Sequence, residues 1–108
     1  MIKVMIVEDD PAFLNRFCRI VTAHPDYELF AAVASGVAAR ESLARGAPDV
    51  LLIDLGLPDV CGTQIIREVA SRHPQTDILV VTVFGDEEHV LASVEAVSYT
   101  HLTLPTKA

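Results

Sequence analysis

The chain has 108 residues, of which 51% are hydrophobic and 21% are charged, and its formal net charge is −7. This composition is typical of one globular domain and excludes a disordered chain. The excess of acids argues against a surface that binds nucleic acid by neutralising phosphates, and it suits a metal cation or a basic partner instead. Apolar runs stay far below the ~18 residues that span a bilayer. The apolar run at the N-terminus meets acids at Glu8 and is too short for a signal peptide, so we expect a cytoplasmic protein without membrane contact.

Short apolar runs and helical patterns alternate along the chain up to about residue 96. Runs of consecutive apolar residues are typical of parallel strands that are covered on both faces. They predict strands at 3–7, 27–33, 50–53 and 78–83. Apolar residues at three- and four-residue spacing predict helices at 11–23, 36–45 and 63–72, and a fourth that begins at 85–88. The alternation with short connections predicts an α/β fold with a parallel sheet and right-handed crossovers.

Several polar residues are interpreted as structural. Asp10 precedes a proline at the start of the first helix and is expected to cap it. His24 and His73 each precede a proline at a predicted helix end. Asp59 follows a Leu-Pro turn and is interpreted as a turn former.

Acidic residues follow two of the predicted strands. Glu8 and Asp9 come directly after the first strand, and Asp54 ends the apolar run of the third. With Thr82 on the fourth strand, they are expected to converge at the carboxyl edge of the sheet, where α/β proteins bind ligands. Three carboxylates this close would raise at least one pKa. Mg²⁺ would relieve the repulsion, and the backbone carbonyl of Gly56 could reach the same ion. Asp54 could then act as a nucleophile that forms an aspartyl phosphate, with the Thr82 hydroxyl donating to a phosphoryl oxygen.

The set of residues resembles a known family. Glu8-Asp9, the stretch Asp-Leu-Gly-Leu-Pro-Asp-Val-Cys-Gly at 54–62, and Thr82 resemble the receiver domains of bacterial two-component response regulators, over residues 2–96. The resemblance implies a flavodoxin-like three-layer α/β sandwich with the parallel strand order 2-1-3-4-5. It also implies that Asp54 accepts a phosphoryl group from a sensor histidine kinase, and that the chain is not a turnover enzyme.

The resemblance extends to the metal and to the output. Asp9, Asp54 and the carbonyl of Gly56 would bind Mg²⁺ directly, Glu8 would help through water, and Thr82 would be the switch hydroxyl. The turn after the third strand resembles most the NarL/LuxR-type subfamily, whose receivers precede a helix-turn-helix domain. This implies transcription regulation through an output domain, pairing with a second receiver, and no direct contact of this domain with nucleic acid.

Residues 97–108 depart from the family pattern. The family's phosphate-pairing lysine should fall near Leu104 and its aromatic switch residue near His101, and the fifth helix has no counterpart. Translated back into DNA, the tail resembles read-through of a sequencing adapter. We therefore expect residues 1–96 to be an incomplete receiver domain and residues 97–108 to be a non-native tail, with the fifth strand and fifth helix missing or non-native.

Other readings remain open. An aspartate-nucleophile phosphohydrolase of the haloacid-dehalogenase type is one alternative. Such an enzyme has a second Asp two residues after the nucleophile, where this chain has Gly56, so this chain lacks the general acid/base that hydrolysis needs. A nucleotide-binding module would show a glycine-rich phosphate loop after the first strand, where acids stand instead. A docking module that no longer uses phosphate is disfavoured because Glu8, Asp9, Asp54 and Thr82 are all present. Cys18 and Cys61 are expected to be free thiols.

Overall fold

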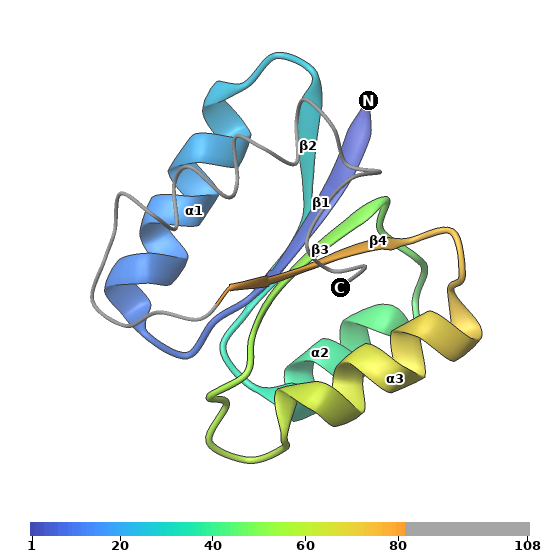
Figure 1. The fold of residues 1–108 in the computed structure, drawn as a ribbon. Helices are drawn as coiled ribbons and strands as arrows, with labels where there is room; N and C mark the ends of the chain where they lie inside the picture. The colour runs from blue at the N-terminus through green and yellow to red at the C-terminus, as the bar shows by residue number, and fades with distance from the viewer. Residues whose placement is uncertain (82–108) are drawn as a thin grey trace.

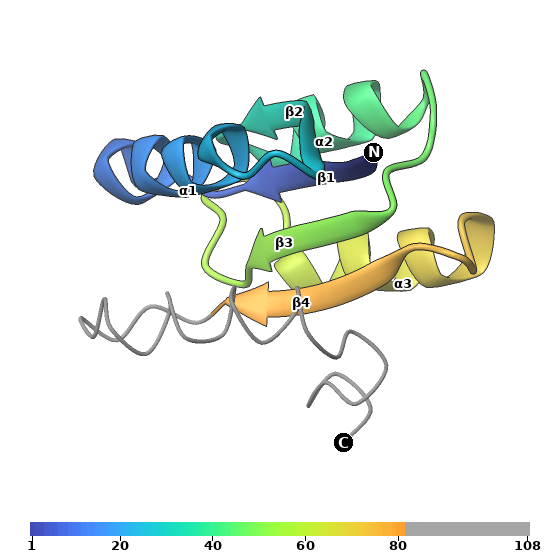
Figure 2. The ribbon, with the colours of Figure 1, turned by 90° about the horizontal axis from the view of Figure 1, so that it is seen from above.

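Four parallel strands form the centre of the molecule. The computed structural model describes residues 1–81, and the predicted fourth helix and the tail lie outside this part. The elements are β1 (Ile2–Val7), α1 (Pro11–Ala23), β2 (Tyr27–Val33), α2 (Gly36–Leu43), β3 (Val50–Asp54), α3 (Gly62–Arg72) and β4 (Asp77–Val81). The strand order is β2-β1-β3-β4, with α1 on one face of the sheet and α2 and α3 on the other (Figures 1 and 2). The predicted order is thus confirmed for the described strands.

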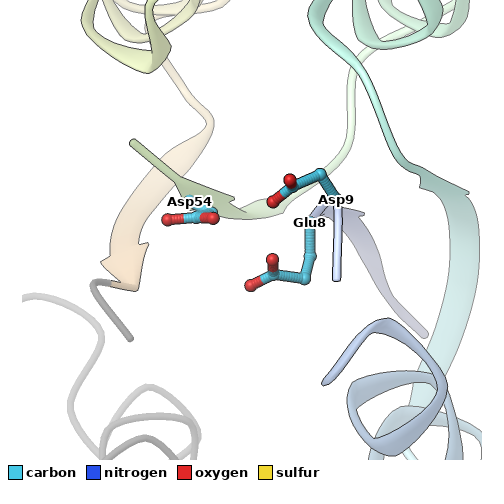
Figure 3. A group of neighbouring side chains, drawn as sticks. All are labelled: Glu8, Asp9 and Asp54. Carbon is cyan, nitrogen blue, oxygen red and sulfur yellow. The ribbon is translucent and has the colours of Figure 1, made fainter. Parts of the chain in front are cut away.

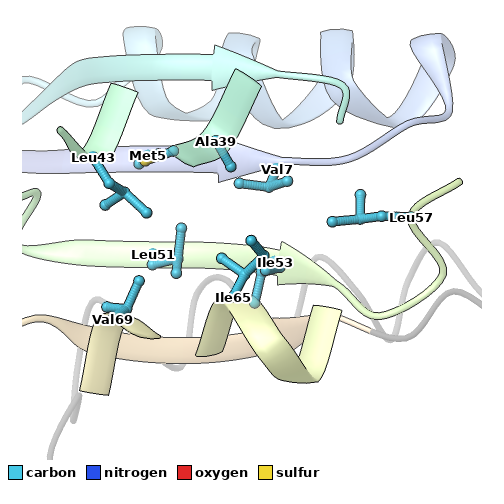
Figure 4. Close-up of a cluster of buried hydrophobic side chains, with 9 residues drawn as sticks. All are labelled: Met5, Val7, Ala39, Leu43, Leu51, Ile53, Leu57, Ile65 and Val69. Carbon is cyan, nitrogen blue, oxygen red and sulfur yellow. The ribbon is translucent and has the colours of Figure 1, made fainter. Parts of the chain in front are cut away.

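The two central strands supply side chains to both faces of the sheet. In β1, Val4 and Ile6 pack with Phe17 of α1, whereas Met5 and Val7 pack toward α2 and α3 (Figure 4). The run Val50–Ile53 divides in the same alternating way. Because helices cover both faces, neither set of side chains meets water, which is why these runs show no polar alternation. Burial of each large apolar side chain contributes about 1.5–3 kcal/mol, so the two clusters hold the layers together.

Helix α1 begins and ends where the sequence predicts. The Asp10 side chain accepts hydrogen bonds from the backbone N–H groups of Ala12 and Phe13, at 2.9 and 3.4 Å, and Pro11 occupies the first helical position. At the other end, His24 is the C-cap residue, and its ring stacks on Tyr27 with 4.1 Å between centroids. Both ends are therefore fixed by side chains next to the helix.

Substitution of the cap is expected to cost about 1 kcal/mol. Asp10→Ala removes the acceptor for two N–H groups that have no partner within the helix, so the free energy of unfolding should fall by about 1 kcal/mol in urea denaturation. Asp10→Asn keeps an acceptor oxygen while removing the charge, and it should retain most of the stability. Equal stability of Asp10→Ala and the unaltered chain would rule out this role.

Five boundaries differ from prediction by one or two residues. Strand β1 begins at Ile2 instead of residue 3, β3 ends at Asp54 instead of residue 53, and α3 begins at Gly62 instead of residue 63. Helix α2 ends at Leu43 instead of residue 45, because the N–H of Arg45 bonds the carbonyl of Ser42 and tightens the last turn. Strand β4 begins at Asp77 instead of residue 78, since the N–H of Asp77 bonds the carbonyl of Asp49 at 2.9 Å and extends the ladder. The predicted end of β4 at residue 83 lies outside the described residues.

Candidate functional site

The carboxyl ends of β1 and β3 bring the predicted acids together. Val7 pairs with Ile53 in the parallel register, so the residues that follow them are neighbours. One carboxylate oxygen from each of Glu8, Asp9 and Asp54 lies within 4.8 Å of the others (Figure 3). The predicted convergence of the three acids is confirmed. Thr82, the fourth residue of the predicted set, lies outside the described residues.

Glu8 is the buried member of the cluster. Its side chain is 2% exposed, its Oε2 accepts from the N–H of Asp10 at 3.0 Å, and its Oε1 is buried without a hydrogen-bond partner among the described residues. Its own N–H bonds the carbonyl of Val33, which fixes the start of the loop after β1. Burial, and to a lesser extent the negative charge of Asp54, raises the pKa of Glu8 to about 7, although the hydrogen bond from the N–H of Asp10 acts to lower it. The predicted rise of one pKa is confirmed, and it falls on this residue.

Asp54 is the half-buried acid at the end of β3. Its Oδ1 accepts a hydrogen bond from the N–H of Gly56 at 3.1 Å, so the turn folds back over the carboxylate. A Cβ at Gly56 would lie 3.7 Å from both carboxylate oxygens, which is an ordinary contact. Space alone therefore does not require glycine here, but its lack of a side chain leaves the carboxylate open on that side.

The loop between β3 and α3 is held at several points. Leu57 is buried in the cluster beneath α2 and α3. Gly62, the first residue of α3, lies directly against the backbone of Asp54 and Leu55, because a Cβ built on it would stand 2.7 Å from the Leu55 Cα and 2.8 Å from the Asp54 carbonyl oxygen. The loop is thus closed at its base and anchored in the core at its centre.

Asp59 has a role that the interpretation as a turn former missed. Its two carboxylate oxygens accept hydrogen bonds from the N–H groups of Gly36 and Val37 at the start of α2, at 2.8 and 3.0 Å. These bonds hold the pKa of Asp59 below its usual range. The side chain of Ser35, the local cap, accepts a hydrogen bond from the N–H of Ala38 at 3.1 Å. The interpretation was incomplete because the partner lies 23 residues earlier in the chain, where local sequence gives no indication.

The donor set fits a hard divalent cation. All three side chains offer oxygen, which Mg²⁺ and Ca²⁺ prefer over nitrogen and sulfur. The unpartnered buried Oε1 of Glu8 and the mutual repulsion of three acids are costs that a nearby positive charge would remove. The residues present are therefore suited to such an ion.

Two smaller expectations concern cysteines and the membrane. Cys18 and Cys61 are both free, as predicted. Among the helices that the structure describes, none is long and apolar enough to cross a membrane.

Comparison with known proteins gives the class. The model of the response regulator receiver domain family matches residues 4–108, and this chain belongs to that family. It is 32% identical over 89 residues to the transcriptional regulatory protein DegU of Brevibacillus brevis, covering 82% of this chain and 38% of DegU. It is 35% identical over 89 residues to the oxygen regulatory protein NreC of Staphylococcus aureus, covering 82% of this chain and 41% of NreC. The chain thus spans less than half the length of these curated relatives.

Solved structures agree. The signal receiver domain of the response regulator NarL from Mycobacterium tuberculosis superposes with a TM-score of 0.70 at 25% identity, over 84% of this chain and 73% of that one. The isolated receiver domain of RcsB from Salmonella enterica, at 20% identity and a TM-score of 0.70, shares the fold. The predicted flavodoxin-like fold and the predicted similarity to NarL/LuxR-type receivers are confirmed. Receiver domains are signalling modules, so the phosphohydrolase alternative is set aside.

Proposed function

We propose that the chain is the phosphoacceptor of a two-component system, with Asp54 taking a phosphoryl group from a sensor histidine kinase. One observation carries this proposal: Asp54 stands at the end of β3, partly open to solvent, with carboxylate oxygens of Glu8 and Asp9 within 4.8 Å. Family membership supports it, because the matched residues 4–108 include all three acids. The site is a phosphate-accepting switch and not a turnover enzyme, since the product stays attached to the chain.

The resident ion in this proposal is Mg²⁺. Asp9, Asp54 and the backbone carbonyl of Gly56 would hold it directly, and Glu8 would hold it through water. When bound, the ion offsets the negative charge of the acids and of an incoming phosphate. The unpartnered Oε1 of Glu8 is the observation that supports a cation at this place.

The reaction uses one carboxylate oxygen of Asp54. This oxygen attacks the phosphorus of the donor and forms an acyl phosphate, while the bond from phosphorus to the donor breaks and the donor keeps its electron pair. The carboxyl end of β3 fixes the direction of the carboxylate, and the N–H of Gly56 at 3.1 Å orients its other oxygen. We propose that the hydroxyl of Thr82 then donates to a phosphoryl oxygen and acts as the switch.

The output is proposed by analogy with the relatives. DegU is named a transcriptional regulatory protein and NreC an oxygen regulatory protein. Their similarity supports a cytoplasmic receiver that controls transcription through a separate DNA-binding domain and pairs with a second receiver. With a net charge of −7 for the chain, this domain itself is unsuited to hold DNA.

We also propose that residues 1–96 form the receiver part and that residues 97–108 are non-native. The departures at Leu104 and His101 support this proposal. The family match extends to residue 108, so the question is decided at the level of DNA. Re-amplification of the source DNA across codon 96 should replace the tail, and a preserved tail would end this proposal.

Asp54→Asn is expected to abolish phosphorylation. The chain is incubated with Mg²⁺ and acetyl phosphate, and intact mass reports one added phosphoryl group that hydroxylamine removes, as expected of an acyl phosphate. The amide of the variant is not a nucleophile for this reaction, so the mass should stay unchanged.

Asp49→Asn is the matched control for this experiment. Asp49 lies at the opposite edge of the sheet, where its Oδ2 accepts from the N–H of Lys3 at 2.8 Å. It should therefore be labelled like the unaltered chain. Equal labelling of Asp54→Asn and Asp49→Asn would exclude Asp54 as the acceptor. Omission of Mg²⁺ should reduce the labelling of both the unaltered chain and the control.

A further inference from the structure

We infer that Asp59 is a positioning residue, which ties the loop that follows Asp54 and carries Gly56 to the start of α2 and thereby sets the geometry of the metal site. The inference rests on the proposed function, because it gives Asp59 a task in that same site. It goes beyond it, since Asp59 belongs to neither the acidic cluster nor the proposed ligands.

Asp59 contacts the start of α2 through hydrogen bonds. Both oxygens of Asp59 are used, one on the N–H of Gly36 at 2.8 Å and the other on that of Val37 at 3.0 Å. These are two of the N–H groups that a helix start leaves without partners, and Ser35 already serves the third, on Ala38. The bond pattern requires a carboxylate that reaches across from another loop. It therefore joins two loops that are distant in sequence.

The loop and the helix start are closely packed beside that contact. A Cβ on Gly36 would lie 2.6 Å from the Cβ of Val60 and 3.3 Å from Oδ1 of Asp59. The loop can reach the helix start only because Gly36 has no side chain. Val60 in turn packs against the buried cluster under α2 and α3. The position of the loop relative to α2 is thus defined by both hydrogen bonds and contact.

The contact of Asp59 and Val60 with α2 is connected to Asp54 through Gly62. Gly62 follows two residues after Val60 and lies against the backbone at the end of β3. A Cβ built on it would stand 2.8 Å from the carbonyl oxygen of Asp54 and 2.7 Å from the Cα of Leu55. Its N–H also bonds the carbonyl of Leu55 at 3.4 Å. A shift of the loop at Asp59 is therefore transmitted through a short, stiff segment to the backbone of Asp54. Displacements of about 1 Å at a reacting group can reduce a rate by roughly 100-fold.

The experiment compares two substitutions at the same helix end. Asp59→Ala removes the tie between loop and helix, whereas Ser35→Ala removes only a local cap of α2 and leaves the loop attached. Both should lower the melting temperature, Asp59→Ala by more than Ser35→Ala, because the first removes two cap bonds and the second removes one. Asp59→Asn keeps one acceptor oxygen and should fall between Asp59→Ala and the unaltered chain. It also serves as the test variant if Asp59→Ala does not fold.

Two readouts separate positioning from stability. Amide hydrogen exchange of Gly56 and Gly62, measured by NMR without metal, should be roughly tenfold faster in Asp59→Ala than in Ser35→Ala. The dissociation constant for Mg²⁺, measured by titration of the same amide signals, should rise roughly tenfold in Asp59→Ala only, as expected when a support of metal ligands is lost.

Each outcome decides the inference. Equal exchange rates in the two variants would overturn it, and so would faster exchange in Asp59→Ala with an unchanged dissociation constant for Mg²⁺. If the unaltered chain binds no Mg²⁺, the proposed metal site falls, while the exchange rates still decide whether Asp59 holds the loop. Phosphorylation of the unaltered chain with normal Mg²⁺ binding in Asp59→Ala would leave the proposed function standing and remove the inference alone.

Discussion

Gly62→Ala is expected to lower the free energy of unfolding by about 3 kcal/mol. The new Cβ would lie 2.7 Å from the Cα of Leu55 and 2.8 Å from the carbonyl oxygen of Asp54, and both are backbone atoms that cannot rotate away. Relief requires α3 to move off the end of β3, which would separate Ile65 from the buried cluster. Urea denaturation measures the loss, and labelling with acetyl phosphate should fall with it because the backbone of Asp54 is displaced.

Gly46→Ala is the matched control for this substitution. Among the described residues, a Cβ there would meet the ring of Phe30 alone, at 3.6 Å, which is an ordinary contact. The stability of Gly46→Ala should therefore stay within about 1 kcal/mol of the unaltered chain, or rise slightly from the lost freedom of the unfolded chain. If Gly62→Ala is no less stable than Gly46→Ala, the close approach of α3 to Asp54 is not a constraint.

The second large effect concerns pH. In the absence of divalent cations, the free energy of unfolding is expected to fall by about 3 kcal/mol as the pH rises from 4.5 to about 7 through the titration of Glu8. The folded-state pKa of about 7 lies above the ordinary value of 4.5, so the folded chain holds a proton that the unfolded chain releases. The contribution is complete below pH 4.5 and is lost as the pH approaches 7. Urea denaturation in EDTA across this range measures it.

Glu8→Gln isolates this contribution from other titrating groups. The amide is close in shape to a protonated carboxyl group and does not ionise, so the variant should be more stable than the unaltered chain at about pH 8 and similar at about pH 4.5. Mg²⁺ should stabilise the unaltered chain more at about pH 8 than at about pH 5, because only the ionised acid attracts the cation. If the two chains show the same slope with pH, the buried carboxyl of Glu8 is not its source.

The fold was predictable because its signals are local. The uninterrupted apolar run at 50–53 requires cover on both faces, and the structure supplies it with α1 on one side and α2 and α3 on the other. The limits of β2 at Tyr27–Val33 agree with prediction, since a proline precedes the strand and a serine-glycine pair follows it. Patterns of this kind need no knowledge of distant neighbours.

The residues of the site were predictable from the sequence, but the differences in burial and pKa among them were not. Strand ends in a parallel sheet converge, so Glu8, Asp9 and Asp54 could be grouped from sequence alone. That Glu8 would be the buried one, with the raised pKa, depends on the packing of the loop after β1 and is not encoded in its neighbours. The role of Asp59 depends likewise on a contact across 23 residues. One indication existed: Ser35 alone cannot satisfy every N–H at the start of α2.

The pairing of β1 with β3 has a consequence for the order of folding. Val4 pairs with Val50 and Val7 with Ile53, so the acids at the ends of these strands meet only after the chain has closed a loop of almost half its length. Such non-local pairing is slow and forms together with the surrounding layers. A nascent chain that has emerged only as far as β2 carries Glu8 and Asp9 and the strand that pairs with β1 on one side, but not yet β3 with Asp54. The acidic cluster of the proposed phosphate-accepting site is therefore complete only when β1 and β3 join.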